Sequence, residues 1–313
     1  MPLIHPPLTV HTVKIRPLSV AAVASVPVVL SAAAVAGSVQ AFRRLGAHPF
    51  EEPSLPGLRL SAPLPSGGSV GFRLSDAGEG IPLVFLHGWG SCSDATWFSV
   101  LPLLDRPFLA VDHPGHGLSS RDGEFSFERA AEAVLTAIDA AGFEKVHLVA
   151  HSMGGGVALE TLRQDSSRVE RVTMVATTAF FSSPLMSLAA LLAPHVISNR
   201  SPVLVRGILR EIEAFPDHAR SVAWAWRNRP EEEVLLASAR TLRSFDARTW
   251  EGFTMPRTLW VIPEEDRVIR PQLQHVSARH FGHDVLSLEA AGHSFFLHDP
   301  QLLLDAFTDV VPG

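Results

Sequence analysis

The sequence predicts an α/β protein built on a mostly parallel sheet with helices on both faces. Short apolar segments that resemble buried strands alternate with stretches of helical periodicity, an order that favours parallel strands joined by crossover helices. A length of 313 residues and a hydrophobic content of 46% suffice for one large domain with an insertion. The strand-like segments include residues 81–86, 108–112, 145–150, 258–262 and 285–288.

One helix has recognisable ends. Ser126 stands directly before an apolar-periodic segment, residues 127–141, where its hydroxyl can cap the first turn. Gly142 follows this segment and predicts its end, because glycine readily adopts the left-handed conformation that closes a helix. We therefore expect a helix over most of residues 127–141.

Residues 145–156, KVHLVAHSMGGG, predict a strand that delivers a serine onto a glycine-lined turn. A nucleophilic serine requires this order, because it occupies a strained turn with its oxygen exposed while small neighbours let strand and helix approach. The usual pattern is G-x-S-x-G, and Ala150 replaces its first glycine by the smallest possible change. Ser152 is the candidate nucleophile, and the alternative is that Gly154–Gly156 form only a flexible turn before a helix.

The motif HGWG, residues 87–90, follows the strand-like segment 81–86 directly. In an acyl-transfer site a backbone N–H on such a loop points at the developing oxyanion, and glycines allow the loop to come close. We assign the oxyanion hole to the backbone N–H groups of Trp89 and Met153. The alternative for HGWG is an ordinary turn at the end of a strand.

Two histidines occur in a second glycine-rich loop, which follows the segment 108–112. Pro114, with the glycines of HPGHGLSS, predicts a tight bend there. His113 and His116 could be considered as metal ligands, but no cysteine or carboxylate cluster at ligand spacing accompanies them. We therefore expect them to pack the loop and expect no metal site.

Taken together, these motifs resemble the α/β-hydrolase family of serine-dependent enzymes. HGWG, DHPGHGLSS, AHSMGG and a late AGHSFF occur in the order of that family and at its usual intervals, over roughly residues 53–311. The resemblance implies an eight-stranded, mostly parallel sheet flanked by helices, with a helical cap inserted over the active site. It also implies that an acid and a histidine follow two later strands.

The resemblance places the acid at Asp266, after the strand-like segment 258–262. Glu264 and Glu265 precede it closely enough to compete for this role. In such a triad, the acid fixes the tautomer of the histidine and stabilises the charge that the histidine acquires.

The resemblance places the general base at His293, after the segment 285–288. Its imidazole would take the proton of Ser152 and later return it to the leaving group. Gly292 before it and the run LHDP after it distinguish it from the other histidines among the fifteen of the chain. His298 is interpreted as packing beside the site.

A serine with a basic histidine and an oxyanion hole suits attack on a carbonyl carbon. We therefore expect hydrolysis of an ester, thioester or amide through an acyl-enzyme. An acyltransferase, a carbon–carbon bond hydrolase or a lyase with the same triad remains an alternative, as does a binding protein without catalysis on this scaffold. No nucleotide or flavin motif is visible, so we expect no cofactor.

The long interval between the core segments, residues 178–253, corresponds to the cap implied by the resemblance. Helical patterns occur within it at residues 202–215 and 231–245. Its large apolar side chains would give the pocket an apolar roof and select a small hydrophobic acyl or aromatic ester. These side chains are Phe180, Phe181, Leu185, Met186, Leu188, Leu191, Leu192, Trp224 and Trp226.

The charge and the cysteine content argue against a nucleic-acid-binding protein and against a disulfide-stabilised one. The net charge is −6 and the basic residues are dispersed, so no nucleic-acid surface is expected. Cys92 is the single cysteine, which excludes an internal disulfide. The oligomeric state does not follow from the sequence.

The N-terminal part holds an uncharged run, residues 18–39, between basic residues. Its length can cross a hydrocarbon core, although alanine, serine and Pro27 make insertion marginal. We expect a membrane anchor, with a cleaved export signal or a buried extra helix as alternatives. The expected organisation is an anchor or signal segment at 1–45, a proline-rich linker at 46–68, a core formed by 69–177 and 254–313, and a helical cap at 178–253.

Overall fold

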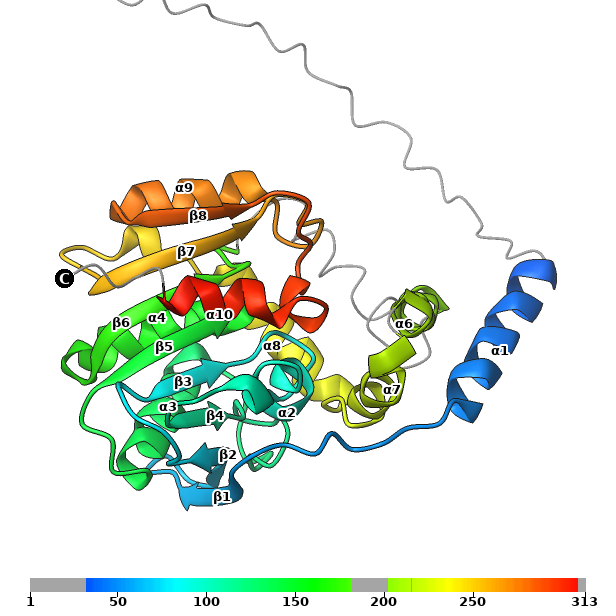
Figure 1. Cartoon of the computed structure of the whole chain (residues 1–313), viewed down its shortest axis with the longest axis horizontal. Coiled ribbons are helices and arrows are strands. Elements are labelled where there is room, and N and C mark those ends of the chain that lie inside the picture. The colour runs from blue at the N-terminus through cyan, green and yellow to red at the C-terminus, as the bar shows by residue number, and fades with distance from the viewer. Residues whose placement is uncertain (1–31, 182–201, 215, 309–313) are drawn as a thin grey trace, which may run out of the picture.

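The computed structural model describes residues 32–181, 202–214 and 216–308. Within these ranges the chain forms an eight-stranded sheet of order β1-β2-β4-β3-β5-β6-β7-β8 (Figure 1). The strands are β1 Leu58–Pro63, β2 Ser69–Ser75, β3 Leu83–Leu86, β4 Phe108–Val111, β5 Val146–His151, β6 Val169–Val175, β7 Arg257–Pro263 and β8 Asp284–Leu288. The helices are α1 Ala32–Ala47, α2 Ser93–Trp97, α3 Phe127–Ala140, α4 Met153–Asp165, α6 Pro202–Ala214, α7 Ala219–Arg227, α8 Glu232–Ser244, α9 Pro271–Phe281 and α10 Pro300–Thr308.

The sheet is parallel except at one edge. β2 runs antiparallel to both β1 and β4, and the pairs from β4 through β3, β5, β6 and β7 to β8 are parallel. This is the expected α/β-hydrolase sheet. The carboxyl ends of the parallel strands meet at one edge, where loops from several strands can converge on a site.

Alternate residues of the central strands supply two separate cores. In β3, Val84 and Leu86 face the cluster that α3, α4 and α9 cover, whereas Leu83 and Phe85 face the cluster that α2 and α10 cover. Because side chains alternate across a strand, a strand buried on both faces has to be apolar throughout. This explains why the buried strands appear in the sequence as continuous apolar runs.

The predicted helix boundaries are confirmed at α3. Ser126 Oγ accepts a hydrogen bond from the backbone N–H of Arg129 at 3.1 Å, and Gly142 follows the helix with φ of +71°. The cap satisfies one of the backbone donors that the first helical turn leaves unpaired. The five predicted strands are likewise present as β3, β4, β5, β7 and β8, with shifts of one or two residues at their ends.

The predicted linker at 46–68 is wrong in its second half. Residues 58–63 form β1, which pairs with β2 from Leu58 opposite Leu74 to Pro63 opposite Ser69. Proline is tolerated because β1 is an edge strand and Pro63 is its last residue. The strand is mostly exposed, so it lacks the apolar run that identifies the central strands.

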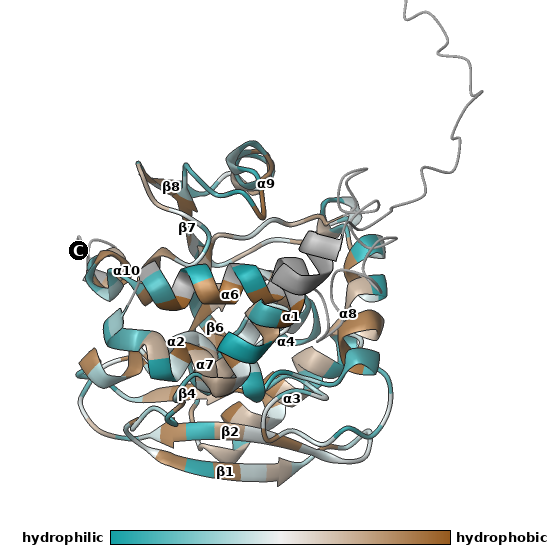
Figure 2. Cartoon of the chain, turned by 90° about the vertical axis from the view of Figure 1, so that its right-hand side faces the viewer, coloured by the Kyte–Doolittle hydropathy of each residue, from teal (hydrophilic) through white to brown (hydrophobic). Residues whose placement is uncertain are grey.

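In the described part of the segment between β6 and β7, the chain forms the helices α6, α7 and α8. The C-terminal half of α1 packs against α6 and α7, and Figures 1 and 2 place these three helices together at one side of the molecule. Ala41 and Leu45 of α1 are buried there against Val205 and Leu209. Arg44 pairs with Glu213 at 2.8 Å on the surface of this cluster.

The expected membrane anchor at residues 18–39 lies mostly outside the described residues. Within the described ranges, no helix combines the length and the apolar character that a membrane crossing requires. Residues 185–192 of the expected apolar roof also lie outside the described residues.

Candidate active site

Ser152 occupies the sharp turn between β5 and α4. Its backbone has φ of 54° and ψ of −119°, a conformation that L-residues rarely adopt. The Ser152 N–H donates to the carbonyl of Val175 at 3.1 Å, and Thr177 Oγ1 donates to the Ser152 carbonyl at 2.6 Å. Bonds to the neighbouring β6 and the residues after it therefore hold the turn.

The three glycines after Met153 let α4 pack closely behind the turn. A Cβ atom on Gly154 would lie 2.5 Å from the carbonyl oxygen of Leu86, and one on Gly155 would lie 2.2 Å from Thr177 Oγ1. A Cβ atom on Gly156 would lie 2.5 Å from the ring of Phe127. Close packing against neighbouring segments and α3 therefore requires glycine at all three positions. The alternative, in which the three glycines form only a flexible turn, does not agree with this packing.

Ala150, the departure from the usual pattern, lies within β5 rather than in the turn. It is fully buried, and its strand partners are Leu86 on one side and Met174 on the other. Its φ is not among the positive values of the chain. The extra methyl group is therefore accommodated in the core without disturbing the conformation of Ser152.

His293 reaches Ser152 from the loop after β8. Ser152 Oγ donates to His293 Nε2 at 3.1 Å. The backbone of the histidine is fixed by His151, whose Nε2–H donates to the His293 carbonyl at 3.1 Å. The residues that follow are held as well, because Trp97 stacks on Phe296 with ring centroids 4.9 Å apart.

Asp266 completes the chain of hydrogen bonds from the turn after β7. His293 Nδ1 donates to Asp266 Oδ2 at 2.8 Å, and the Asp266 side chain is fully buried. Its Oδ1 accepts from the backbone N–H groups of Val268 and Ile269 at 2.8 and 2.9 Å. These charge-assisted bonds keep the carboxylate oriented toward the imidazole.

The two competing carboxylates lie elsewhere. Glu264 and Glu265 are exposed, and Glu264 accepts from His275 Nε2 at 2.9 Å. Their backbones serve a different purpose, because the N–H of Glu264 donates to the Leu288 carbonyl and the N–H of Glu265 to the Ala291 carbonyl. The acid turn is thereby tied to the segment that leads to the histidine.

The HGWG loop has the orientation that an oxyanion site needs. His87 Nδ1 donates to the Gly88 carbonyl at 2.8 Å, while His87 Nε2 accepts from the backbone N–H of His113 at 3.1 Å. In a trans peptide the C=O and the following N–H point in opposite directions, so the Trp89 N–H is directed away from His87. Gly88 and Trp89 line the same cavity as Ser152.

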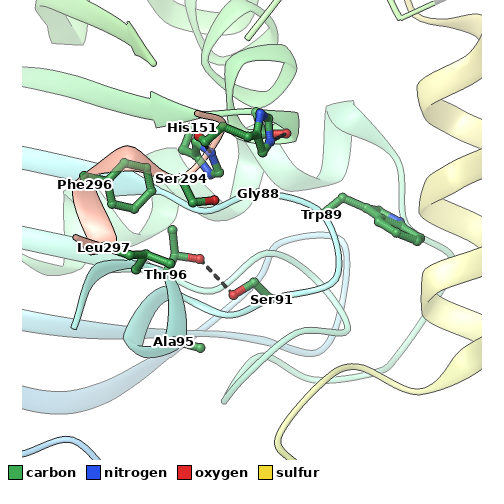
Figure 3. A pocket seen from close by; sticks show the side chains of 11 residues that line it. Gly88, Trp89, Ser91, Ala95, Thr96, His151, Ser294, Phe296 and Leu297 are labelled. Carbon is green, nitrogen blue, oxygen red and sulfur yellow. Dashed lines mark hydrogen bonds between the residues drawn. The ribbon is translucent and has the colours of Figure 1, made fainter. Parts of the chain in front are cut away.

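The second predicted donor, the backbone N–H of Met153, is the first of α4. A first-turn N–H has no acceptor within its own helix and lies at the positive end of the helix dipole. The side chain of Trp89 is directed away from Ser152. It points toward α8, where its Nε1 donates to Ser238 Oγ at 2.9 Å (Figure 3).

A cavity of about 170 Å³ opens beside Ser152 and His293. Its apolar lining comes from α2 and from the residues after His293, namely Ala95, Phe296 and Leu297. Hydroxyl groups of Ser91, Thr96 and Ser294 line another part of the cavity (Figure 3). The site is thus a small pocket with both apolar and hydroxyl walls.

The apolar side chains that the sequence analysis assigned to a roof lie elsewhere where they are described. Phe181 packs against Phe245 in the core, and Phe180 carries the guanidinium of Arg248 over its ring. Trp226 packs in the cluster of α1, α6 and α7. Among the described residues, none of these side chains lines the cavity at Ser152.

His113 and His116 form a buried group of imidazole rings with His87. The ring centroids of His87 and His113 are 4.0 Å apart, and His116 Nδ1 donates to the Pro114 carbonyl at 3.0 Å. Burial lowers the pKa of His113 to about 3 and that of His116 to about 4, so both are neutral near pH 7. They support the glycine-rich loops by packing and hydrogen bonding.

This arrangement can perform nucleophilic catalysis at a carbonyl group. The serine has a base within hydrogen-bond distance, the base is oriented by a buried carboxylate, and the loop residues Gly88 and Trp89 line the same cavity as the serine. The model of the Alpha/beta hydrolase family matches residues 83–306, well over half of the chain. The chain belongs to the alpha/beta hydrolase family. The expectation of an enzyme of the α/β-hydrolase type is confirmed at this level.

Individual relatives resemble this α/β-hydrolase over different lengths. The pimeloyl-[acyl-carrier protein] methyl ester esterase of Methylococcus capsulatus is 29% identical over 192 residues, which are 57% of this chain and 74% of the esterase. The dihydrolipoyllysine-residue acetyltransferase component of the acetoin cleaving system of Cupriavidus necator is 38% identical over 100 residues, which are 31% of this chain and 27% of that protein. The match therefore spans about a quarter of the acetyltransferase component.

Among solved structures, a thermophilic esterase from Thermogutta terrifontis superposes with a TM-score of 0.68. The two sequences are 20% identical, and the match covers 81% of this chain and 97% of the esterase. At this identity the likeness shows the fold of the α/β-hydrolase, and its chemistry has to be argued from the site.

Several supporting residues of the α/β-hydrolase escaped the sequence analysis. Gln274 on α9 donates through Nε2 to Asp266 Oδ2 at 2.9 Å and is fully buried. His151 was noted only as a letter of the elbow motif, although it holds the His293 backbone. His151 could have been found from the sequence, because it directly precedes the nucleophile. No local sequence pattern identifies Gln274.

Proposed function

We propose that the protein is a serine hydrolase that cleaves a carboxylic ester through an acyl-enzyme intermediate. The observation that carries the proposal is the continuous hydrogen-bonded chain from Ser152 Oγ through His293 to Asp266, with distances of 3.1 and 2.8 Å. Esterases among the relatives and among the similar structures support an ester as the substrate.

In the proposed first step, Ser152 Oγ attacks the ester carbonyl carbon while His293 Nε2 takes the serine proton. The negative charge that develops on the carbonyl oxygen is stabilised by the N–H groups of Trp89 and Met153. The C–O bond to the alcohol then breaks, and His293 returns the proton to the departing alcohol. Asp266 stabilises the imidazolium that exists between these two proton transfers.

Deacylation repeats these events with water. His293 accepts a proton from water, the oxygen of which attacks the acyl carbon, and the serine leaves with the returned proton. Activity should fall on the acid side, because a protonated His293 cannot accept the serine proton. A thioester or amide would follow the same course with a different leaving group.

For the substrate, we propose a short ester with an aliphatic skeleton. Ala95, Phe296 and Leu297 offer apolar contacts, and about 170 Å³ lies below the 300–1,000 Å³ or so of sites for drug-sized ligands. We also propose that α6, α7 and α8 act as the cap. The hydrogen bond from Trp89 of the HGWG loop to Ser238 of α8 supports this role.

Hydrolysis of p-nitrophenyl acetate and butyrate tests the proposed function. The wild type should release p-nitrophenol steadily, and Ser152→Ala should lower kcat by about 10⁴-fold or more. Ser244→Ala changes an exposed serine of α8 and should match the wild type. Equal rates in Ser152→Ala and the wild type would refute the nucleophile.

We further propose that residues 18–39 attach the protein to a membrane. The support is the sequence alone, an uncharged run of 22 residues with basic residues on both sides. Flotation of the full chain with phospholipid vesicles tests this, with a chain that begins at residue 40 as the comparison. Equal flotation of both proteins would contradict an anchor in this run.

A further inference from the structure

The cavity beside Ser152 has a wall of hydroxyl groups that the proposed ester chemistry does not use. It is formed by Ser91 and Thr96, before and on α2, and by Ser294, the residue after His293. In Figure 3 the hydroxyl oxygens of these three residues face the same open region, with Phe296 and Leu297 beside it. We call this set the hydroxyl wall.

The hydroxyl groups of Thr96 and Ser91 already donate hydrogen bonds within the protein. Thr96 Oγ1 donates to Ser91 Oγ at 2.9 Å, and Ser91 Oγ donates to the Cys92 carbonyl at 3.3 Å. Both hydrogens are thus used, while lone pairs remain on both oxygens. This side of the wall accepts hydrogen bonds.

Ser294 supplies the opposite capability. No group among the described residues forms a hydrogen bond with its hydroxyl, so its hydrogen is available to an acceptor in the cavity. A hydroxyl group donates one hydrogen bond and accepts others. A substrate hydroxyl therefore complements the whole wall, whereas a ketone oxygen would satisfy only Ser294.

The side of the wall formed by Ser91 and Thr96 is held in place, because two carboxylates fix the start of α2. Asp94 accepts from Arg73 Nε and Nη2 at 2.7 and 2.8 Å, and all of these groups are buried. Asp112 Oδ1 accepts from both the backbone N–H and the hydroxyl of Ser93, at 2.8 and 2.7 Å. Such fixed positions favour recognition of a specific group over adaptation to any apolar surface.

Resting on the proposed ester hydrolysis, we propose that the hydroxyl wall is a specificity subsite for a hydroxyl group carried by a short aliphatic ester. The apolar side chains beside it contact the carbon skeleton, and the wall binds the hydroxyl. An ester without this group would offer no acceptor to the hydroxyl hydrogen of Ser294 and no donor to the remaining lone pairs of Ser91 and Thr96, which disfavours its reaction.

The test compares esters that differ only by a hydroxyl group. Ethyl lactate is paired with ethyl propionate, and ethyl 3-hydroxybutyrate with ethyl butyrate. In at least one pair, kcat/KM of the wild type should favour the hydroxylated ester by about tenfold. Thr96→Val and Ser294→Ala should bring this ratio toward one, while Thr249→Val, an exposed threonine outside the cavity, should keep the wild-type ratio.

Two outcomes would overturn the subsite while leaving ester hydrolysis intact. The first is a wild-type ratio of one or below in both pairs. The second is a wild-type preference that persists unchanged in both Thr96→Val and Ser294→Ala. A protein that hydrolyses none of the four esters and does not react with a fluorophosphonate would instead refute the proposed function, and the subsite with it.

Discussion

Ser152 illustrates how a single residue carries both strain and chemistry. A non-glycine residue with φ of 54° and ψ of −119° costs of order 1–3 kcal/mol, which the surrounding structure has to supply. Hydrogen bonds from Ser152 to Val175 and from Thr177 to Ser152, together with the glycines of α4, hold the turn. In return the hydroxyl stands clear of its own helix and within reach of His293.

Gln274 helps to orient the catalytic acid Asp266. Gln274→Leu removes the hydrogen bond from Nε2 to Asp266 but keeps the volume of the side chain, so kcat should fall about tenfold with KM unchanged. Steady-state kinetics with a p-nitrophenyl ester measure both constants.

The matched control is Gln272→Leu on the exposed side of the same helix, which should leave both constants unchanged. A positioning role for Gln274 predicts that the loss lies in kcat alone. A Gln274→Leu variant with wild-type kcat would show that the two backbone N–H groups suffice to orient Asp266.

At the scale of elements, the site depends on how closely α4 approaches the sheet. Gly154 lies against the carbonyl of Leu86, the residue that precedes the oxyanion loop, so one contact sets the spacing of the nucleophile and the loop. Backbone atoms cannot move aside as the end of a side chain can. Position 154 therefore has to be glycine, because any larger residue would clash with the backbone of Leu86.

Gly154→Ala should destabilise the protein by about 1–3 kcal/mol, because its Cβ atom would lie 2.5 Å from a backbone oxygen. Denaturation by urea measures this loss. Gly46→Ala is the matched control, since Gly46 lies in α1 with no atom near the position of its Cβ. Equal stability of Gly154→Ala and the wild type would contradict the close approach of α4.

The elements differ in how well the sequence predicted them. The buried strands were found because burial on both faces demands continuous apolar runs. The glycine-rich turn after one of them located Ser152, and the resemblance to the α/β-hydrolase family placed Asp266 and His293. β1 was missed because an exposed edge strand carries no such run. The packing of α1 on α6 and α7 was missed because it joins segments more than 150 residues apart, which local patterns do not report.

For the whole molecule, buried histidines couple stability to pH. Desolvation holds the pKa of each well below 6.5 in the folded protein, to about 3 for His113 and His147 and about 4 for His116. The same direction applies to His87 and His151. Below pH 6.5 the unfolded chain binds protons that the folded protein does not, so the free energy of unfolding falls as pH decreases.

His113, His116 and His147 should each lower the free energy of unfolding by about 2 kcal/mol between pH 7 and pH 5, and Asp112, the pKa of which is raised to about 6 by burial, should offset about 1 kcal/mol of the total. A net loss of several kcal/mol is a large part of the stability of a typical domain, so the urea midpoint should fall clearly as the pH decreases from 7 to 5. Urea midpoints between pH 7 and pH 5 measure the slope.

Two variants distinguish the effect of a buried histidine on the pH dependence of stability from that of an exposed histidine. His147→Gln can retain a hydrogen bond to Thr173 and should flatten the slope by about one proton. His280→Gln changes an exposed histidine and should not alter it. A urea midpoint that stays constant from pH 7 to pH 5 would show that these imidazoles are protonated in the folded protein.

The chemistry of Ser152 is tested most directly by reaction with a fluorophosphonate, followed by digestion and mass spectrometry of the peptides. We expect one adduct, on the peptide that contains Ser152, and none in Ser152→Ala. His293→Ala should react much more slowly, because the serine then lacks its base. An adduct on another residue of the wild type, or equal labelling of Ser152→Ala, would contradict the assignment of the nucleophile.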